Sequence, residues 1–123
     1  MVRKILPVLI YIALTNDFAE AEVFKVTAYC NCFLCTEKPK DHKAYGITAS
    51  GKIASPGTVA VDKKVIPLGS RLKILGLKGV FRAEDTGKRI KGRHIEIWFP
   101  THKKAKRFGV QHLEVKISDL SPK

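Results

Sequence analysis

Two carboxylates lie in the segment AEDTGKRIKGRHIEIWF, which runs from Ala83 to Phe99. Asp85 stands before a loop rich in glycine and basic residues, and Glu96 stands eleven positions later. Cleavage of a glycoside by acid catalysis needs a carboxylic acid that can protonate the leaving oxygen. The alternative is that the two residues are surface charges on a cationic protein.

The stretch HIEIWF alternates with the period of a strand, so its side chains divide between two faces. One face is apolar and is expected in the core: Ile95, Ile97 and Phe99. The other face is expected to be exposed: His94, Glu96 and Trp98. A carboxyl group beside an aromatic plane suits a sugar ring. Spacing alone favours the plainer alternative, in which Glu96 is a solvated strand residue and Trp98 is half-buried in a barrel.

Asp62 and Asp85 each follow a short apolar stretch, in VAVD and FRAED. Aspartates at such positions commonly cap turns through hydrogen bonds to the backbone. If they instead approach Glu96, like charges raise the pKa of a carboxyl group, and an acid that stays protonated is what glycoside cleavage requires. Periodicity does not decide between these roles.

Three cysteines stand close together in YCNCFLC, at Cys30, Cys32 and Cys35. The spacing of Cys32 and Cys35 permits a small disulfide, and an odd count leaves one thiol over. A zinc site needs a fourth ligand, for which His42 is the nearest candidate. Because there is no second C-x-x-C, we expect a local disulfide or free thiols, with no metal or other cofactor, and zinc stays as the alternative.

Short strands separated by glycine turns predict the framework that positions these residues. They are expected at 22–29, 58–61, 71–75, 79–85, 93–99 and 112–117, with a loop over 31–45 and one helix over 101–109. Helical spacers between the strands are missing, which argues against a parallel α/β unit. The pattern predicts a compact all-β barrel.

The first residues have the layout of a secretory signal peptide. MVRK is a cationic start, ILPVLIYIAL is an apolar run of ten, and AEA at 19–21 is a small-x-small cleavage site. Ten apolar residues fall short of the ~20 that span a bilayer, so we expect no stable membrane span in the mature chain. We therefore predict a signal peptide over 1–21, one domain over 22–123, and export to the periplasm, cell wall or exterior.

The formal charge of +12 must be interpreted together with export. Outside the membrane the available polyanions are acidic cell-wall polymers or lipid head groups, and not nucleic acid. The lysines are spread over loops and do not alternate with aromatic residues as in single-strand binders. Anionic wall polymers are thus possible partners, and simple solubility is the alternative.

Four segments together closely resemble the 3D domain, the three-aspartate family of peptidoglycan lytic enzymes: GITASG, GTVAVDKKVIPLGSRLKI, AEDTGKRIKGRHIEIWF and AKRFG. The family includes the C-terminal part of membrane-bound lytic transglycosylase A and small stationary-phase survival proteins. The resemblance covers roughly Val26 to Ile117. It implies a six-stranded double-psi β-barrel, similar to rare lipoprotein A-like domains.

By this resemblance the three family aspartates fall on Asp62, Asp85 and the position of Glu96. The family uses the third position as catalytic acid and base, and here glutamate extends the carboxyl group by one methylene, about 1.5 Å. Glutamate serves as the acid in many glycosidases, so we expect the pocket to have adjusted. Four further positions match the family near its cleft and imply substrate contacts: Tyr29, Thr48, Ser50 and Gly51. Trp98 is the expected sugar platform.

The activity that this resemblance implies is cleavage of the β-1,4 bond between N-acetylmuramic acid and N-acetylglucosamine in peptidoglycan glycan strands. Glu96 would act as acid and then as base, giving a 1,6-anhydro product, with Asp85 and Asp62 in support and no metal. The alternative is a module that binds cell-wall polysaccharide without cleaving it, since fold does not fix function.

Overall fold

The computed structural model describes residues 18–118, so most of the predicted signal peptide and residues 119–123 lie outside the described part. All six predicted strands are present: β1 (Glu22–Tyr29), β2 (Thr58–Ala60), β3 (Arg71–Ile74), β4 (Phe81–Asp85), β5 (His94–Trp98) and β6 (Gln111–Ser118). Helix α3 (His102–Phe108) lies where a helix was predicted. The predicted loop over 31–45 also contains one helical turn, α2 (Phe33–Thr36). Neither helix has the length or apolar character needed to cross a bilayer.

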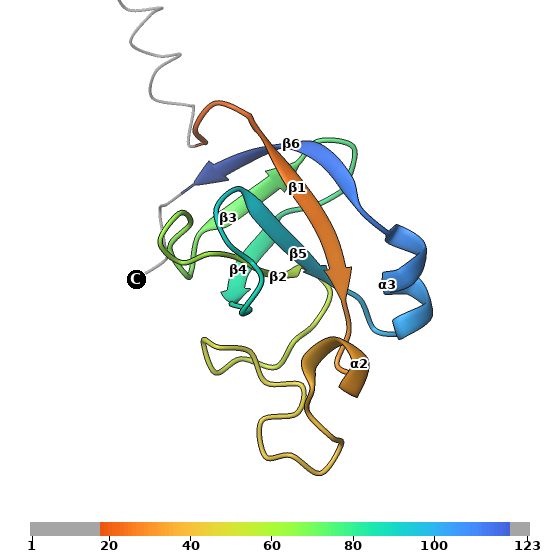
Figure 1. The fold of residues 1–123 in the computed structure, drawn as a ribbon. Coiled ribbons are helices and arrows are strands. Elements are labelled where there is room, and N and C mark those ends of the chain that lie inside the picture. The colour runs from red at the N-terminus through yellow and green to blue at the C-terminus, as the bar shows by residue number, and fades with distance from the viewer. Residues whose placement is uncertain (1–17, 119–123) are drawn as a thin grey trace, which may run out of the picture.

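The strands close into a barrel in the order β1-β5-β2-β4-β3-β6 (Figure 1). Two pairs are parallel, β1 with β5 and β2 with β4, and the other pairs are antiparallel. Because β1 and β5 run in the same direction, the segments that follow them leave the barrel at the same end. The closed six-stranded barrel confirms the all-β fold predicted from the sequence.

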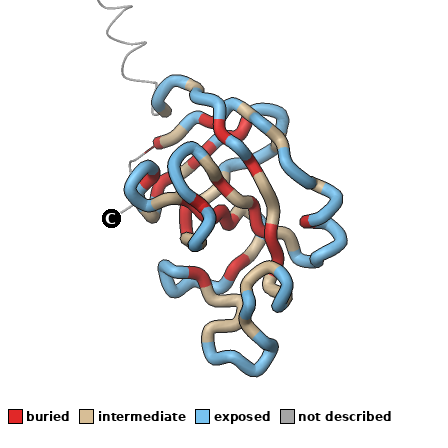
Figure 2. The backbone as a smooth tube through the Cα atoms, in the orientation of Figure 1, coloured by how far each residue is buried: buried red, intermediate tan, exposed pale blue. Residues whose placement is uncertain are grey.

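The barrel core is made mainly from the inward positions of the alternating strands, with Val61 and Ile66 added from the segment after β2, and most buried parts of the chain follow the strands in Figure 2. Its buried members are Phe24, Val26, Val59, Val61, Ile66, Leu72, Ile74, Ala83, Ile95, Ile97 and Val115. Burying one such large side chain stabilises a fold by about 1.5–3 kcal/mol. Ile95 and Ile97 thus anchor β5 from one face, as its pattern predicted.

A second, smaller cluster covers the other face of β5 and corrects one expectation. It consists of Tyr29, Ala54, Ala60, Ile90 and Trp98. Trp98 was expected on an exposed face, but only 9% of its surface is accessible. The reason is that residues from two connecting segments, Ala54 and Ile90, pack over this face. A strand of a closed barrel can be covered on its outer face by loops, which alternation does not reveal.

Helix α3 begins and ends as its sequence predicts. The side chain of Thr101 accepts a hydrogen bond from Lys104 N at 3.2 Å, which caps the first turn. The chain leaves the helix at Gly109, whose φ of 69° favours glycine. Phe108 packs against Phe99 with ring centroids 5.5 Å apart. These contacts place His102, the first residue of α3, beside the end of β1.

Candidate functional site

Strand pairing sets four residues in a row across β1, β5, β2 and β4. Thr27 is paired with Glu96, Glu96 with Ala60, and Ala60 with Asp85. Paired residues of neighbouring strands point to the same face, so Glu96 and Asp85 flank the small side chain of Ala60. The structure therefore brings together the two carboxylates that stand eleven positions apart in the sequence. We call these four residues the carboxylate row.

Glu96 is half-buried in this row and is held by its neighbour on β1. Thr27 Oγ1 donates a hydrogen bond to Glu96 Oε2 at 3.1 Å, and it also lies 2.8 Å from His94 Nε2. Burial raises the pKa of Glu96, the hydrogen bond from Thr27 opposes this, and the nearby charge of Asp85 adds to the rise. Glu96 is thus a carboxyl group that holds its proton to higher pH than a free glutamate.

Asp85 is fixed in place by three donors. Tyr29 Oη donates to Oδ2 at 2.7 Å, and the backbone N–H groups of Ala49 and Thr86 donate to Oδ1, each at 2.9 Å. Burial raises the pKa of Tyr29 far above its usual range, and the charge of Asp85 raises it further. The phenol therefore stays protonated and keeps donating to Asp85 at all ordinary pH values.

The turn at residues 48–51 lies against the end of β4. Ser50 N donates to Glu84 O at 3.1 Å, and Thr48 Oγ1 lies 3.0 Å from Ser50 Oγ. Gly51 closes the turn with its N–H on Thr48 O at 2.9 Å and a φ of 85°. The predicted contact residues of this turn are therefore neighbours of Asp85, with Ser50 and Gly51 exposed.

Asp62 is held differently from the other two acidic residues. Its Oδ1 accepts from Lys64 N at 3.0 Å, and its Oδ2 accepts from Gly92 N at 2.9 Å. The bonds from Gly92 and Lys64 lower the pKa of Asp62. The first bond, from Lys64 N, is a turn cap, which is the alternative role that the position of Asp62 in the sequence predicted. The second ties the segment after β2 to the loop before β5.

Sequence reasoning did not identify several supporting residues. Thr27 lies on the polar face of an alternating strand, but no pattern in the sequence shows that its position pairs with Glu96. Glu84 is buried beside Asp85 and binds Thr58 Oγ1 at 2.8 Å and Arg82 Nε at 3.1 Å. Asn31 Oδ1 accepts from the indole Nε1 of Trp98 at 2.8 Å. Such pairs become visible only in three dimensions.

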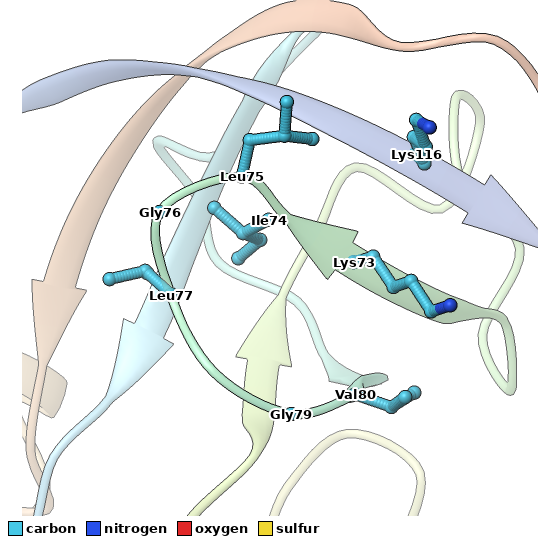
Figure 3. A pocket seen from close by; sticks show the side chains of 8 residues that line it. All are labelled: Lys73, Ile74, Leu75, Gly76, Leu77, Gly79, Val80 and Lys116. Atoms are coloured by element: carbon cyan, nitrogen blue, oxygen red, sulfur yellow. The ribbon is translucent and has the colours of Figure 1, made fainter.

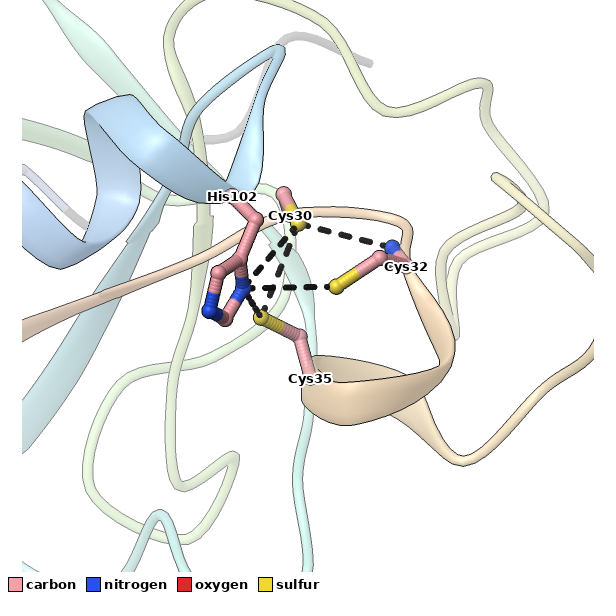
Figure 4. Close-up of side chains that lie close together, drawn as sticks. All are labelled: Cys30, Cys32, Cys35 and His102. Carbon is pink, nitrogen blue, oxygen red and sulfur yellow. Dashed lines mark hydrogen bonds between the residues drawn. The ribbon is translucent and has the colours of Figure 1, made fainter.

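A second group of side chains lies just past the ends of β1 and β5 (Figure 4). Its members are Cys30, Cys32, Cys35 and His102, whose three sulfurs and Nδ1 atom all lie within 4.8 Å of one another. We call it the thiol–imidazole cluster. All three cysteines are free, so none of them forms the small disulfide that the spacing permitted.

The fourth member of this cluster corrects the ligand suggested by sequence spacing. His42 was the nearest candidate, but its Nδ1 accepts a hydrogen bond from Ala44 N at 2.9 Å within its own loop. His102 lies far along the chain from the cysteines, in the segment that follows β5. It reaches them because β1 and β5 are parallel neighbours. The histidine nearest to the cysteines in the sequence is therefore not the one nearest to them in space.

The thiols of the cluster differ in acidity. Burial raises the pKa of Cys30 to about 12. Burial also acts to raise that of Cys32, but hydrogen bonds from Cys30, Cys35 and His102 outweigh it and lower the pKa to about 7.

Two hollows in the surface of residues 18–118 lie away from the carboxylate row. One, of about 380 Å³, is formed by the turn after β3 with Lys73 and Lys116 at its side (Figure 3). The other, of about 570 Å³, is lined mainly by apolar side chains, including Trp98, Phe99 and Phe108. Neither contains Glu96 or Asp85, so these two hollows give no support to the site that the acidic residues define.

Comparison with protein families gives a match to the 3D domain over residues 57–120. The chain is 40% identical over 76 residues to the cell wall-binding protein YocH of Bacillus subtilis (strain 168), which covers 58% of this chain and 26% of YocH. It is 37% identical over 92 residues to the putative cell wall shaping protein YabE of the same organism, covering 74% of this chain and 21% of YabE. The chain thus spans about a quarter of the length of these relatives.

Among solved structures, two of the E. coli lytic transglycosylase MltA are similar to this chain. A variant in an apo form aligns with a TM-score of 0.49 and 22% identity, over 62% of this chain and 28% of that one. The other structure aligns with a TM-score of 0.49 and 24% identity, over 65% and 29%.

Proposed function

We infer the function from the premise that this chain belongs to the 3D domain family, whose model matches residues 57–120. We propose that it is an exported cell-wall domain that acts on the glycan strands of peptidoglycan. It cleaves the β-1,4 bond between N-acetylmuramic acid and N-acetylglucosamine, with Glu96 as acid and base. The names of its relatives, a cell wall-binding and a cell wall-shaping protein, support the location and the partner.

The observation that carries this proposal is the environment of Glu96. Its side chain is half-buried, it receives a hydrogen bond from Thr27, and its pKa is raised by burial and by Asp85. A general acid for glycoside cleavage must hold a proton near the working pH. The bond from Thr27 also accounts for the glutamate at this position, because it fixes the end of a side chain that is one methylene longer than aspartate.

The proposed reaction has two proton transfers through one carboxyl group. Protonated Glu96 donates to the glycosidic oxygen as the bond from that oxygen to C1 of the muramic acid residue breaks. The carboxylate that results then takes the proton of the 6-hydroxyl as its oxygen bonds to C1. The products are a 1,6-anhydro sugar end and a free 4-hydroxyl on N-acetylglucosamine, and Glu96 is protonated again.

Asp85 has the second role in this scheme. Its charge keeps the proton on Glu96 and stabilises the positive charge that develops on the sugar ring. Tyr29 and the backbone of Ala49 hold it in position, and the exposed Ser50 and Gly51 next to it offer contacts to the glycan. We assign Asp62 a positioning role, since both of its oxygens are occupied by backbone donors.

In this proposal Trp98 holds β5 in position and is not a platform for a sugar ring. Its indole is bonded to Asn31 and packs with Tyr29, and the residue is only 9% exposed, so little of the indole plane is open to a pyranose ring. It therefore maintains the position of β5, on which Glu96 lies.

A second candidate function is binding to the cell wall without cleavage. The name of the relative that binds the wall favours it, and so does the charge of +12, which suits anionic wall polymers. Binding alone does not require the protonated carboxyl group, so the two functions differ in their dependence on Glu96.

One experiment separates the two functions. The full chain and its Glu96→Gln variant are incubated with purified peptidoglycan, the insoluble wall is pelleted, and soluble fragments are analysed by mass spectrometry. Glu114→Gln, which changes an exposed glutamate on β6, is the matched control. We expect anhydro-muropeptides from the native chain and the control, and a loss of at least about 100-fold in Glu96→Gln. All three proteins should pellet with the wall. Pelleting with no soluble fragment from any of them would support the binding module instead.

A further inference from the structure

We propose that the thiol–imidazole cluster is a structural zinc site, with Cys30, Cys32, Cys35 and His102 as its four ligands. This proposal is independent of the proposed catalytic activity. A set of three cysteines and one histidine is one of the common ligand sets of structural zinc. The four residues come from two segments, one following β1 and one at the start of α3.

Four of the six distances between the ligand atoms are close to the edges of a zinc tetrahedron, and all six lie within 4.8 Å. Zinc binds sulfur at about 2.3 Å and imidazole nitrogen at about 2.0–2.1 Å, so the edges are about 3.8 Å between sulfurs and about 3.6 Å between sulfur and nitrogen. Here Cys30 Sγ and Cys35 Sγ are 3.6 Å apart. His102 Nδ1 lies 3.4 Å from Cys32 Sγ, 3.6 Å from Cys35 Sγ and 4.0 Å from Cys30 Sγ. One ion can therefore reach all four atoms with little rearrangement.

A disulfide fits the cluster less well. The S–S bond measures about 2.05 Å, whereas the sulfurs of Cys30 and Cys35 are 3.6 Å apart. Any single disulfide would leave the third thiol beside an imidazole. Zinc uses all four groups at once, which explains why a histidine from a distant segment faces the three sulfurs (Figure 4).

One backbone N–H group of the cluster is placed to donate to a thiolate. The backbone N–H of Cys32 donates to Cys30 Sγ at 3.4 Å, and such bonds stabilise a sulfur that carries negative charge. Binding releases the three thiol protons, and His102 uses the lone pair of Nδ1 while its proton stays on Nε2. The bound site carries a net charge of −1, close to the basic side chains of α3 in KKAKR.

Zinc at this position would join the segments that follow two parallel strands. Tyr29, which holds Asp85, directly precedes Cys30, and Asn31, which holds Trp98, lies between Cys30 and Cys32. On the other side, His102 follows β5 by four positions. The metal therefore secures the ends of β1 and β5 together, and it is a positioning element and not a participant in the proposed cleavage.

The test measures metal and does not depend on activity. The full chain is purified under reducing conditions, and its zinc content is determined by mass spectrometry, with Co²⁺ substitution followed by absorption spectroscopy. His102→Ala and Cys32→Ser remove ligands. The matched controls are His42→Ala and His112→Ala, which change exposed histidines outside the cluster.

We expect one zinc per native chain, retained in both controls and reduced at least tenfold in the two ligand variants. Co²⁺ should give thiolate charge-transfer bands and the strong visible absorption of a tetrahedral site. A zinc chelator should lower the melting temperature by about 10 °C or more. Because a ligand variant can fail to fold, the cobalt spectrum of the native chain serves as the second measurement. A native chain with less than about 0.1 zinc and no cobalt–thiolate bands overturns the proposal, as does a stable disulfide in the exported protein.

Discussion

The carboxylate row crosses four strands of the barrel, and the thiol–imidazole cluster lies just past the ends of two of them, β1 and β5, yet the two groups are held in opposite ways. The row is built on four hydrogen-bonded strands, and its members are set by register, as in the pairing of Ala60 with both Glu96 and Asp85. The cluster is built on segments that leave the barrel, and one of its members is exposed, His102. Strand pairing and hydrogen bonds position the first group, whereas the proposed zinc ion would bridge the side chains of the second.

This difference in how the two groups are held indicates which of them suits catalysis and which suits a structural role. Groups fixed by register keep their geometry without a ligand, which suits acid–base work that depends on small distances. Groups that converge from loops gain order from a bound ion, which suits a structural role. The two regions meet at Tyr29 and Asn31, which flank Cys30. Changes in each region should therefore give different readouts.

Among changes to the residues that support Glu96, the largest effect is expected for Asp85→Asn, which removes the charge of Asp85 and keeps the shape of its side chain. The amide oxygen can still accept from Ala49 and Thr86, so the melting temperature should change by only a few degrees. Release of anhydro-muropeptides should fall about 100-fold, because the charge that holds the proton on Glu96 and stabilises the sugar cation is lost. Mass spectrometry of the fragments measures this, with the exposed Asp41→Asn as control. An unchanged rate would remove Asp85 from the mechanism.

A smaller effect is expected for Tyr29→Phe, which deletes the donor to Asp85 Oδ2. The loss of this bond leaves one oxygen of Asp85 without a partner and should cost about 1 kcal/mol of unfolding free energy and about tenfold in rate. Denaturant unfolding and fragment release measure the two quantities, and Tyr45→Phe is the control. If stability falls but the rate does not, Tyr29 serves the fold alone.

The third prediction tests the boundary between the two regions. Asn31→Ala removes the acceptor of the Trp98 indole and should lower the unfolding free energy by about 1 kcal/mol. Because Asn31 offers no ligand, zinc content should stay at the level of the native chain. Asn31→Asp keeps an acceptor oxygen and should recover most of the stability. Loss of zinc in Asn31→Ala would mean that the two regions are not separable.

The smallest effect is a pH dependence of stability. The raised pKa of Glu96 means that the folded chain binds its proton more tightly than the unfolded chain does. This contribution is fully present below the unfolded value of about 4.3 and is lost as pH rises through the folded pKa. Unfolding free energy should therefore decline with rising pH in that window. The decline should be weaker in Glu96→Gln but not in Glu114→Gln, and equal slopes in all three would contradict it.

The sequence predicted the framework well because strand alternation and glycine turns are local signals. Alternation predicts the bounds of β1, and Thr101 and Gly109 predict those of α3. The order of the strands around the barrel does not follow from such local signals. Burial of Trp98 was mispredicted for the same reason, since the segments carrying Ala54 and Ile90 fold over β5 from elsewhere in the chain. Local pattern gives the elements, and contacts between distant segments decide which faces are covered.

The acidic residues and the thiol–imidazole cluster also separate what a local sequence pattern predicts from what contacts between distant segments decide. Glu96 and Asp85 were singled out by type and by family resemblance, and their proximity rests on the pairing of Ala60 with both. Sequence distance pointed to His42 as the partner of the cysteines, and the parallel pairing of β1 with β5 brought His102 instead. A ligand supplied from 67 positions beyond Cys35 leaves no signal in one sequence.

Closure of the barrel has a consequence for how this domain behaves at high density. A sheet that ends in a free strand presents unpaired N–H and C=O groups, which serve as a template for another chain. The strands within residues 22–118 form a ring in which every strand has two neighbours. Within these residues, copies crowded on a polymer surface therefore have no free edge of the barrel through which to polymerise, and the barrel is left to recognise a partner by side chains and turns.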